Sequence, residues 1–221
     1  MVTKNRDFVH KKTKGKIGYV HVPNMSIWGY SEFYRSYISE SEKEGLIIDV
    51  RYNGGGNVSQ HLLKILKQKV IGFDTTRYFG IEKYPNSAIN GPIVCLTNEH
   101  AGSDGDIFSH AFKLMKIGKL IGKRTWGGVI GIWPRLGLND GSLTTQPEFS
   151  HWFEDVGYDV ENYGTEPDIE VDILPSDYAK GIDPQLDRSI KEALKDIKKN
   201  HLSMDGLNKK KPNLKLPKLP I

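Results

Sequence analysis

Ser103 is the residue of this sequence that is best placed to act as a nucleophile. It lies in the segment NEHAGSDGDIF, between an apolar run typical of a strand and an apolar pattern typical of a helix. A hydroxyl group at the start of a helix can attack a carbonyl carbon when a base accepts its proton. Serine is also a favoured helix cap, worth about 1 kcal/mol, and Asp104 and Asp106 suit the positive end of a helix dipole without any chemistry. The segment alone favours the cap and leaves the nucleophile open.

A second loop could supply the electrostatic part of such a reaction. The segment DVRYNGGGNVSQ places Asn53 and three glycines between a predicted strand and a predicted helix. In an open α/β sheet both loops would lie at the carboxyl ends of parallel strands, where ligands collect. Successive glycines can point consecutive N–H groups at one negative atom, although a flexible turn explains them too. Together the loops offer a hydroxyl, the N–H of Asp104 and a second N–H, which is what acyl transfer requires.

Local sequence marks no metal site and no base. A metal site built on Asp104 and Asp106 lacks His or Cys partners at ligand spacing, so we expect no metal and no cofactor. His100 lies near Ser103 in the sequence, but on a turn where a hydrogen bond to the backbone is its commoner role. The seven histidines lie at positions 10, 21, 61, 100, 110, 151 and 201, and none has a context that identifies a general base.

Alternating strands and helices must position these loops. Short apolar or alternating runs predict strands at 16–22, 46–50, 70–73, 92–97 and 119–122. Apolar stripes at helical spacing predict helices at 31–45, with Gly45 as the C-cap, at 59–68 and at 106–118. This alternation indicates an α/β layered fold with a largely parallel sheet.

The remaining segments are organised differently. Between Thr125 and about Asp172, glycines, tryptophans and short alternating stretches predict loops and hairpins. A final helix is expected within 183–200, with Pro184 in its first turn. Residues 199–221 form a Lys/Pro-rich tail that we expect to be disordered, and residues 1–14 form a basic N-terminal lead.

Bulk composition excludes several classes of protein. The chain has 221 residues, of which 38% are hydrophobic and 26% are charged, as in globular proteins. Its one cysteine, Cys95, excludes an internal disulfide framework. Many lysines behind the net charge of +4 lie at the two ends, so we expect no nucleic-acid partner. Because no apolar run suits a membrane span or a signal peptide, we expect no membrane partner and a cytoplasmic location.

Five segments together resemble the catalytic domain of the tail-specific serine peptidases, in the branch of the tricorn protease. They are GLIIDVRYNGGGNVSQ, LTNEHAGSDGDIFS, LIGKRTWGGVIGI, DGSLTTQPEFSHWF and VENYGTEPD, in family order from about Gly15 to Lys195. The resemblance implies a crotonase-like (ClpP/crotonase) layered domain, which we place at residues 15–198. It also implies serine-type hydrolysis of short peptides through an acyl-enzyme.

The resemblance assigns roles to five positions of this chain. Ser103 matches the nucleophile, and the backbone N–H groups of Gly56 and Asp104 match the oxyanion hole. Glu161, 58 positions after Ser103 (161 − 103), matches a glutamate in the catalytic hydrogen-bond network. Asp74 matches the acidic residue that favours basic side chains before the scissile bond and that reaches the site from a neighbouring subunit. The resemblance therefore also implies a homo-oligomer.

The base departs from the pattern of the superfamily. Related tail-specific peptidases use a lysine 25 residues after the serine, and here that position (103 + 25) is Gly128. Lys119 and Lys123 are out of register, which disfavours a Ser-Lys dyad. In the tricorn branch the base is a histidine in a helical region upstream of this domain. We therefore expect the base histidine outside this chain, either because the chain is a fragment or truncated form, or because another domain or subunit supplies it.

Two other functions stay open. A non-catalytic subunit that binds peptides or holds an assembly together would fit the missing base. A crotonase-like acyl-CoA enzyme would share the oxyanion architecture, although the serine of GSDGD and the match at Glu161 favour a peptidase.

Overall fold

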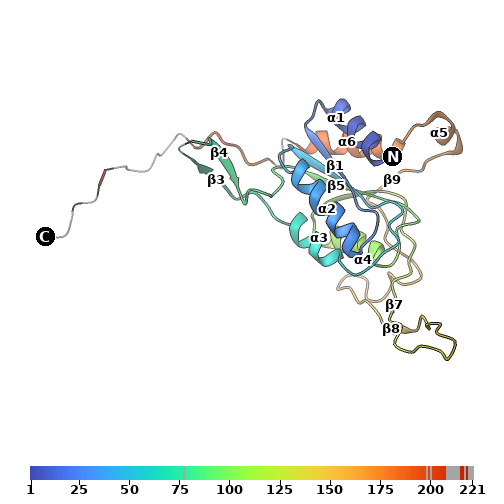
Figure 1. Ribbon diagram of the computed structural model, residues 1–221. Coiled ribbons are helices and arrows are strands. Elements are labelled where there is room, and N and C mark those ends of the chain that lie inside the picture. The colour runs from blue at the N-terminus through green and yellow to red at the C-terminus, as the bar shows by residue number, and fades with distance from the viewer. Residues whose placement is uncertain (77, 198, 200, 208–214, 217, 219–221) are drawn as a thin grey trace.

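A five-stranded parallel sheet forms the centre of the computed structural model (Figure 1). The model describes residues 1–76, 78–197, 199, 201–207, 215, 216 and 218. The strands are β1 (Ile17–His21), β2 (Gly45–Asp49), β5 (Ile93–Thr97), β6 (Gly118–Gly122) and β9 (Ile169–Glu170), in the order β1-β2-β5-β6-β9. All four pairings are parallel. The predicted α/β fold with a parallel sheet is thus confirmed.

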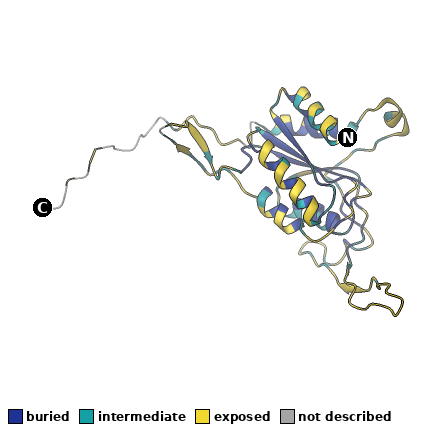
Figure 2. Cartoon of the chain, in the orientation of Figure 1, coloured by how far each residue is buried: buried dark blue, intermediate teal, exposed yellow. Residues whose placement is uncertain are grey.

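Helices cover both faces of this sheet. One face carries α2 (Ile27–Glu40), α3 (Ser59–Leu66) and α4 (Asp104–Leu114), and the other carries α1 (Val2–Thr13) and α6 (Pro184–Asp196). In β2, Leu46 and Ile48 join the first apolar cluster, whereas Ile47 joins the second. This strand is buried on both sides, which explains its continuous apolar sequence. Figure 2 shows the buried sheet between helices whose outer faces are exposed.

Two hairpins project from this body in opposite directions (Figure 1). One consists of β3 (Gly72–Thr75) and β4 (Ile81–Tyr84), and the other of β7 (Gly131–Ile132) and β8 (Pro147–Phe149). The strand expected at 70–73 therefore exists in part as β3, but it pairs only with β4 and lies outside the central sheet. The loops and hairpins predicted after Thr125 are confirmed, with β9 as the one strand of that region in the central sheet.

The second helix differs from its prediction at both ends. It begins at Ile27 because the hydroxyl of Ser26 accepts hydrogen bonds from the N–H groups of Trp28 and Gly29. It ends at Glu40, so Gly45 is not its C-cap and instead opens β2. A β-carbon at Gly45 would lie 2.9 Å from Cδ1 of Ile17 and 3.0 Å from the backbone carbonyl oxygen of Pro92, so the space beside this strand is tight.

The ends of the chain add features that the sequence pattern did not indicate. Residues 2–13 of the expected basic lead form α1, whose Val9 is fully buried in the second apolar cluster. A short helix, α5 (Pro175–Lys180), precedes α6. The disorder predicted for 199–221 concerns residues that lie largely outside the described part of the chain. Within that part, the side chain of Asn90 binds both the N–H and the carbonyl of Leu202.

The helices of the described residues include none with the length and apolar character that a bilayer span would need.

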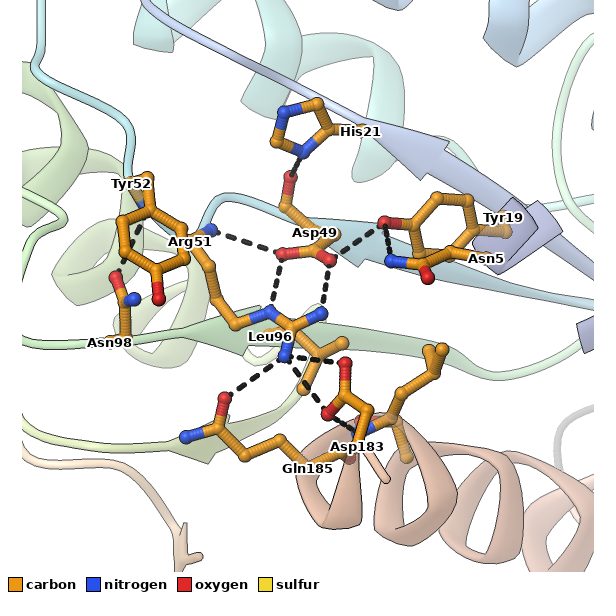
Figure 3. A network of polar contacts seen from close by, with 12 residues as sticks. Asn5, Tyr19, His21, Asp49, Arg51, Tyr52, Leu96, Asn98, Asp183 and Gln185 are labelled. Atoms are coloured by element: carbon orange, nitrogen blue, oxygen red, sulfur yellow. Dashed lines mark hydrogen bonds and ion pairs between the residues drawn. The ribbon is translucent and has the colours of Figure 1, made fainter. Parts of the chain in front are cut away.

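A buried ionic network joins the end of β2 to the start of α6 (Figure 3). The guanidinium of Arg51 donates to both carboxylate oxygens of Asp49, at 2.9 and 2.7 Å, and to Asp183 at 3.0 Å. Arg51 also binds Gln185, and the hydroxyl of Tyr19 donates to Asp49 at 2.7 Å. Burial opposes ionisation of Asp49, but the charge of Arg51 holds the pKa of Asp49 below its ordinary value. The network therefore contains an ionised carboxylate that depends on one arginine.

We expect Arg51→Met to lower the free energy of unfolding by about 3 to 5 kcal/mol at pH 7, because it leaves Asp49 buried and unpaired. The depressed pKa means that the pair stabilises the fold above about pH 4 and that this contribution is lost as the pH falls through the folded pKa. The difference in free energy of unfolding between wild type and variant should therefore become smaller at acidic pH. Urea unfolding at pH 7 and pH 3 measures it, with the exposed Arg35→Met as a control that should change little.

Candidate active site at the carboxyl ends of β2 and β5

The two loops identified in the sequence meet at the ends of two adjacent strands. The glycine loop, residues 53–56, follows β2, and the nucleophile loop, residues 98–103, follows β5, which is paired with β2. The carbonyl oxygen of Asn53 accepts a hydrogen bond of 2.9 Å from the N–H of Gly102. A β-carbon at Gly55 would lie 2.6 Å from Cβ of Ser103 and 2.9 Å from N of Asp104. The glycine loop thus lies directly against Ser103.

Ser103 has a backbone conformation that is unusual for a side-chain-bearing residue. Its φ of 55° and ψ of −122° lie in a region that favours glycine. It occupies the N-cap position of α4, but its side chain makes no capping hydrogen bond. Ser103 is therefore an N-cap residue by position, but its hydroxyl does not cap the helix. The half-buried hydroxyl is left free for another role, as a strained residue at a functional site often is.

Two backbone N–H groups at this junction are not used within the fold. Among the described residues, neither the N–H of Gly56 nor that of Asp104 donates to a backbone or side-chain acceptor. Gly56 has a φ of 149°, and a β-carbon there would lie 2.0 Å from the carbonyl oxygen of Met25. Gly56 directly follows Gly55, whose β-carbon position lies against Ser103 and Asp104, so the three residues belong to one junction. Their role as an oxyanion hole beside a nucleophile, which the family resemblance implies, stays a prediction.

Asn53 holds the glycine loop in place, a role that the sequence did not indicate. Its side chain is fully buried, donates to the carbonyl of Val22 at 2.8 Å and accepts from the N–H of Gly55 at 2.9 Å. Together with the bond from Gly102, these contacts tie three separate segments to one residue. The sequence signal for this role was the position of Asn53 directly before the three glycines.

The carboxylates of Asp104 and Asp106 bind protein groups. Asp104 accepts from the N–H and hydroxyl of Ser59 at 2.9 and 2.5 Å, which joins the start of α4 to α3. Asp106 is fully buried and accepts from the N–H of Gly127 at 2.9 Å. Its burial raises its pKa, although the Thr125 hydroxyl and nearby backbone N–H groups oppose the shift. In the described part of the chain, no three His, Cys, Asp or Glu side chains are grouped to hold a metal.

Glu161 is connected to the nucleophile loop through the segment 125–130. One of its carboxylate oxygens accepts from the N–H groups of Val129 and Ile130, at 2.6 and 2.8 Å. Earlier in the same segment, the N–H of Trp126 donates to Ala101 at 3.0 Å. Glu161 also lines a hollow of 210 Å³ together with His151 and Tyr158. Glu161 is therefore a half-buried carboxylate that two backbone N–H groups hold beside an open space.

Asp74 does not join this group within one chain. It lies on β3 opposite Glu82, exposed, on the hairpin that projects from the body (Figure 1). Its expected role requires a neighbouring copy, and that role stays a prediction.

No histidine or lysine of the described residues is placed as the base. None of them forms a hydrogen bond to the Ser103 hydroxyl. His100 stacks on the ring of Tyr52 with centroids 5.2 Å apart, and His110 binds Asp155 at 3.0 Å. At Gly128, where related peptidases have their lysine, a β-carbon would lie 2.3 Å from the ring of Trp126. A side chain at position 128 would therefore require the Trp126 ring to move.

We expect Gly55→Ala to displace the glycine loop, because φ is +91° there and the new methyl group would overlap Ser103. The strain should cost about 1 to 3 kcal/mol of stability and shift the amide resonances of Gly56 and Asp104. Gly54→Ala is the matched control, since its β-carbon would meet nothing within 4 Å. Urea unfolding and two-dimensional amide NMR of both variants test this, and equal spectra would contradict the assigned packing.

Comparisons with known proteins agree with these observations. Residues 16–171 match the model of peptidase family S41. The chain is 51% identical over 197 residues to the tricorn protease of Thermoplasma acidophilum, covering 89% of this chain and 18% of that protein. It is 54% identical over 196 residues to the putative tricorn-like protease C-terminal subunit of Sulfurisphaera tokodaii, covering 89% of this chain and 23% of that one.

The fold comparison gives the same result. A crystal structure of the tricorn protease matches with a TM-score of 0.85 at 52% identity, over 90% of this chain and 19% of that one. The chain thus spans about a fifth of the length of these relatives. The family resemblance of the five sequence segments is confirmed, and the chain belongs to peptidase family S41.

Proposed function

We propose that this chain is a serine peptidase domain that cleaves short peptides, with Ser103 as its nucleophile. The observation that carries this proposal is the free hydroxyl of Ser103, held in a strained conformation against the glycine loop. Two unused N–H groups, those of Gly56 and Asp104, lie at the same junction. The match to a peptidase family supports the reaction class. We also propose that the layered α/β domain has a crotonase-like fold.

In the proposed reaction, Oγ of Ser103 attacks the carbonyl carbon of the scissile bond while its proton passes to a base. The carbonyl oxygen gains negative charge and accepts hydrogen bonds from Gly56 and Asp104, each worth about 2.7 to 4 kcal/mol in the transition state. The base then donates its proton to the leaving amine, which leaves an acyl group on Ser103. Water attacks that ester and releases the second product.

We propose that the base is a histidine that another domain or subunit supplies to this site. Glu161 would orient it from the edge of its hollow, where one carboxylate oxygen is held by two backbone N–H groups. Without a base, the rest of such a triad retains only a small part of its activity.

A second candidate function is a non-catalytic subunit that binds peptides or supports an assembly. The observation that favours it is the lack of any hydrogen bond between Ser103 Oγ and a base among the described residues. The relative from Sulfurisphaera tokodaii is named as a C-terminal subunit, which supports a division of such a protease into subunits.

Hydrolysis of a fluorogenic peptide with lysine before the reporter separates the two candidates. We expect Ser103→Ala to lower the rate by at least about a thousandfold wherever the wild-type chain is active, alone or with its base-bearing partner. A fluorophosphonate should label Ser103 in the wild type and nothing in the variant. Equal hydrolysis by both proteins would instead favour the binding subunit.

Asp74 is proposed to pair with a Lys or Arg side chain of a peptide bound to a neighbouring copy in a homo-oligomer. We expect Asp74→Asn to lower kcat/KM for cleavage after Lys or Arg about 10- to 100-fold more than after Leu or Phe. Glu82→Gln, directly across the hairpin, is the matched control and should keep the preference. An unchanged preference in Asp74→Asn would remove this assignment.

A further inference from the structure

Trp126 is a large aromatic residue that is both exposed and held in place. Its relative exposure is 66%, although it follows a buried threonine and precedes a buried glycine. The backbone around it is fixed by three successive N–H donors. Thr125 donates to Thr165 at 3.1 Å, Trp126 to Ala101 at 3.0 Å, and Gly127 to the buried carboxylate of Asp106 at 2.9 Å. The ring therefore stands on a rigid segment and not on a flexible loop.

The six-membered ring of the indole packs close to the backbone that precedes Ser103. A β-carbon at Gly102 would lie 2.7 Å from Cε3 of Trp126, and one at Gly128 would lie 2.3 Å from Cζ3. Both glycines thus leave room for the indole, which packs on them with one side and keeps the rest in solvent. Gly102 is the residue directly before the nucleophile. The exposed indole is therefore packed next to the residue that precedes Ser103.

A fixed, exposed indole is well suited to bind another molecule. Tryptophan offers a large apolar area, and an aromatic pair adds about 0.5 to 1.5 kcal/mol beyond the area it buries. Little conformational entropy is lost on binding when the side chain is already held in place. Aromatic anchors of this kind are enriched among the residues that dominate binding energy.

We propose that Trp126 binds an apolar or aromatic side chain of the peptide residue that flanks the scissile bond. This inference rests on the proposed function, because it takes the ligand of the Ser103 site to be a peptide. It assigns to this site a second specificity contact, in addition to the charge of Asp74. Because the ring packs beside Gly102, the residue before Ser103, a peptide side chain in contact with it would bring the peptide close to the nucleophile loop.

Fluorescence of a chain in which Trp126 is the only tryptophan tests the proposal without any need for catalysis. Trp28, Trp133 and Trp152 are replaced by Phe, and Ser103→Ala prevents turnover. Three hexapeptides of equal charge carry Phe-Ala, Ala-Phe or Ala-Ala around the bond. We expect at least one Phe peptide to change the Trp126 emission saturably and to bind about tenfold more tightly than the Ala-Ala peptide.

Single substitutions in the otherwise native chain, read by calorimetry, complete the experiment. Trp126→Ala should remove the preference for Phe and Trp126→Phe should keep part of it, while Trp133→Ala on the projecting hairpin should keep it all. The proposal is overturned if Trp126→Ala retains the preference, or if no peptide binds up to millimolar concentration. It is also overturned if the Trp126 emission shifts with protein concentration alone, because the ring would then contact a second copy. Binding that depends on Trp126, without hydrolysis by the wild type even in the presence of its base-bearing partner, would reject the peptidase function and retain this inference.

Discussion

The close contact between the glycine loop and the nucleophile loop is the constraint on which the rest of the site depends. The hydrogen bond from Gly102 N–H to the Asn53 carbonyl joins the ends of β2 and β5, which are already paired as neighbouring strands. A β-carbon at Gly105 would lie 2.9 Å from that same carbonyl oxygen. Small residues are therefore required on both sides of the junction. Ser103 and the N–H of Asp104 lie at this contact through Gly55, and the N–H of Gly56 is the next one along the chain.

A second level of support comes from the segment 125–130, which connects parts of the chain that are distant in sequence. It binds the nucleophile loop through Ala101, the first turn of α4 through Asp106, and Glu161 through two N–H groups. The same segment thus positions Glu161 and the loop that carries Ser103, although no hydrogen bond joins these two residues directly. Replacing the segment by a flexible loop would leave the junction of β2 and β5 intact but would separate the carboxylate from it.

Much of this arrangement could be predicted, because it depends on patterns that are local in sequence. Buried strands such as β2 show as continuous apolar runs, and glycines between a strand and a helix mark the loops at their ends. Gly45 was misassigned because its close neighbours, Ile17 and the carbonyl of Pro92, lie far from it in the sequence. The roles of Asn53 and Asp106 were missed for the same reason, since their partners lie 31 and 21 residues away. Helix α1 is strongly polar, so its pattern did not separate it from a solvated lead.

The packing of the Trp126 ring against Gly128 also couples two positions of the segment 125–130. A β-carbon at position 128 would lie 2.3 Å from Cζ3 of the indole, so any larger residue there would push the exposed ring aside. The same ring packs beside Gly102, the residue before Ser103. A substitution at Gly128 would therefore be felt at the nucleophile loop, although the two segments are separated by more than twenty residues of sequence.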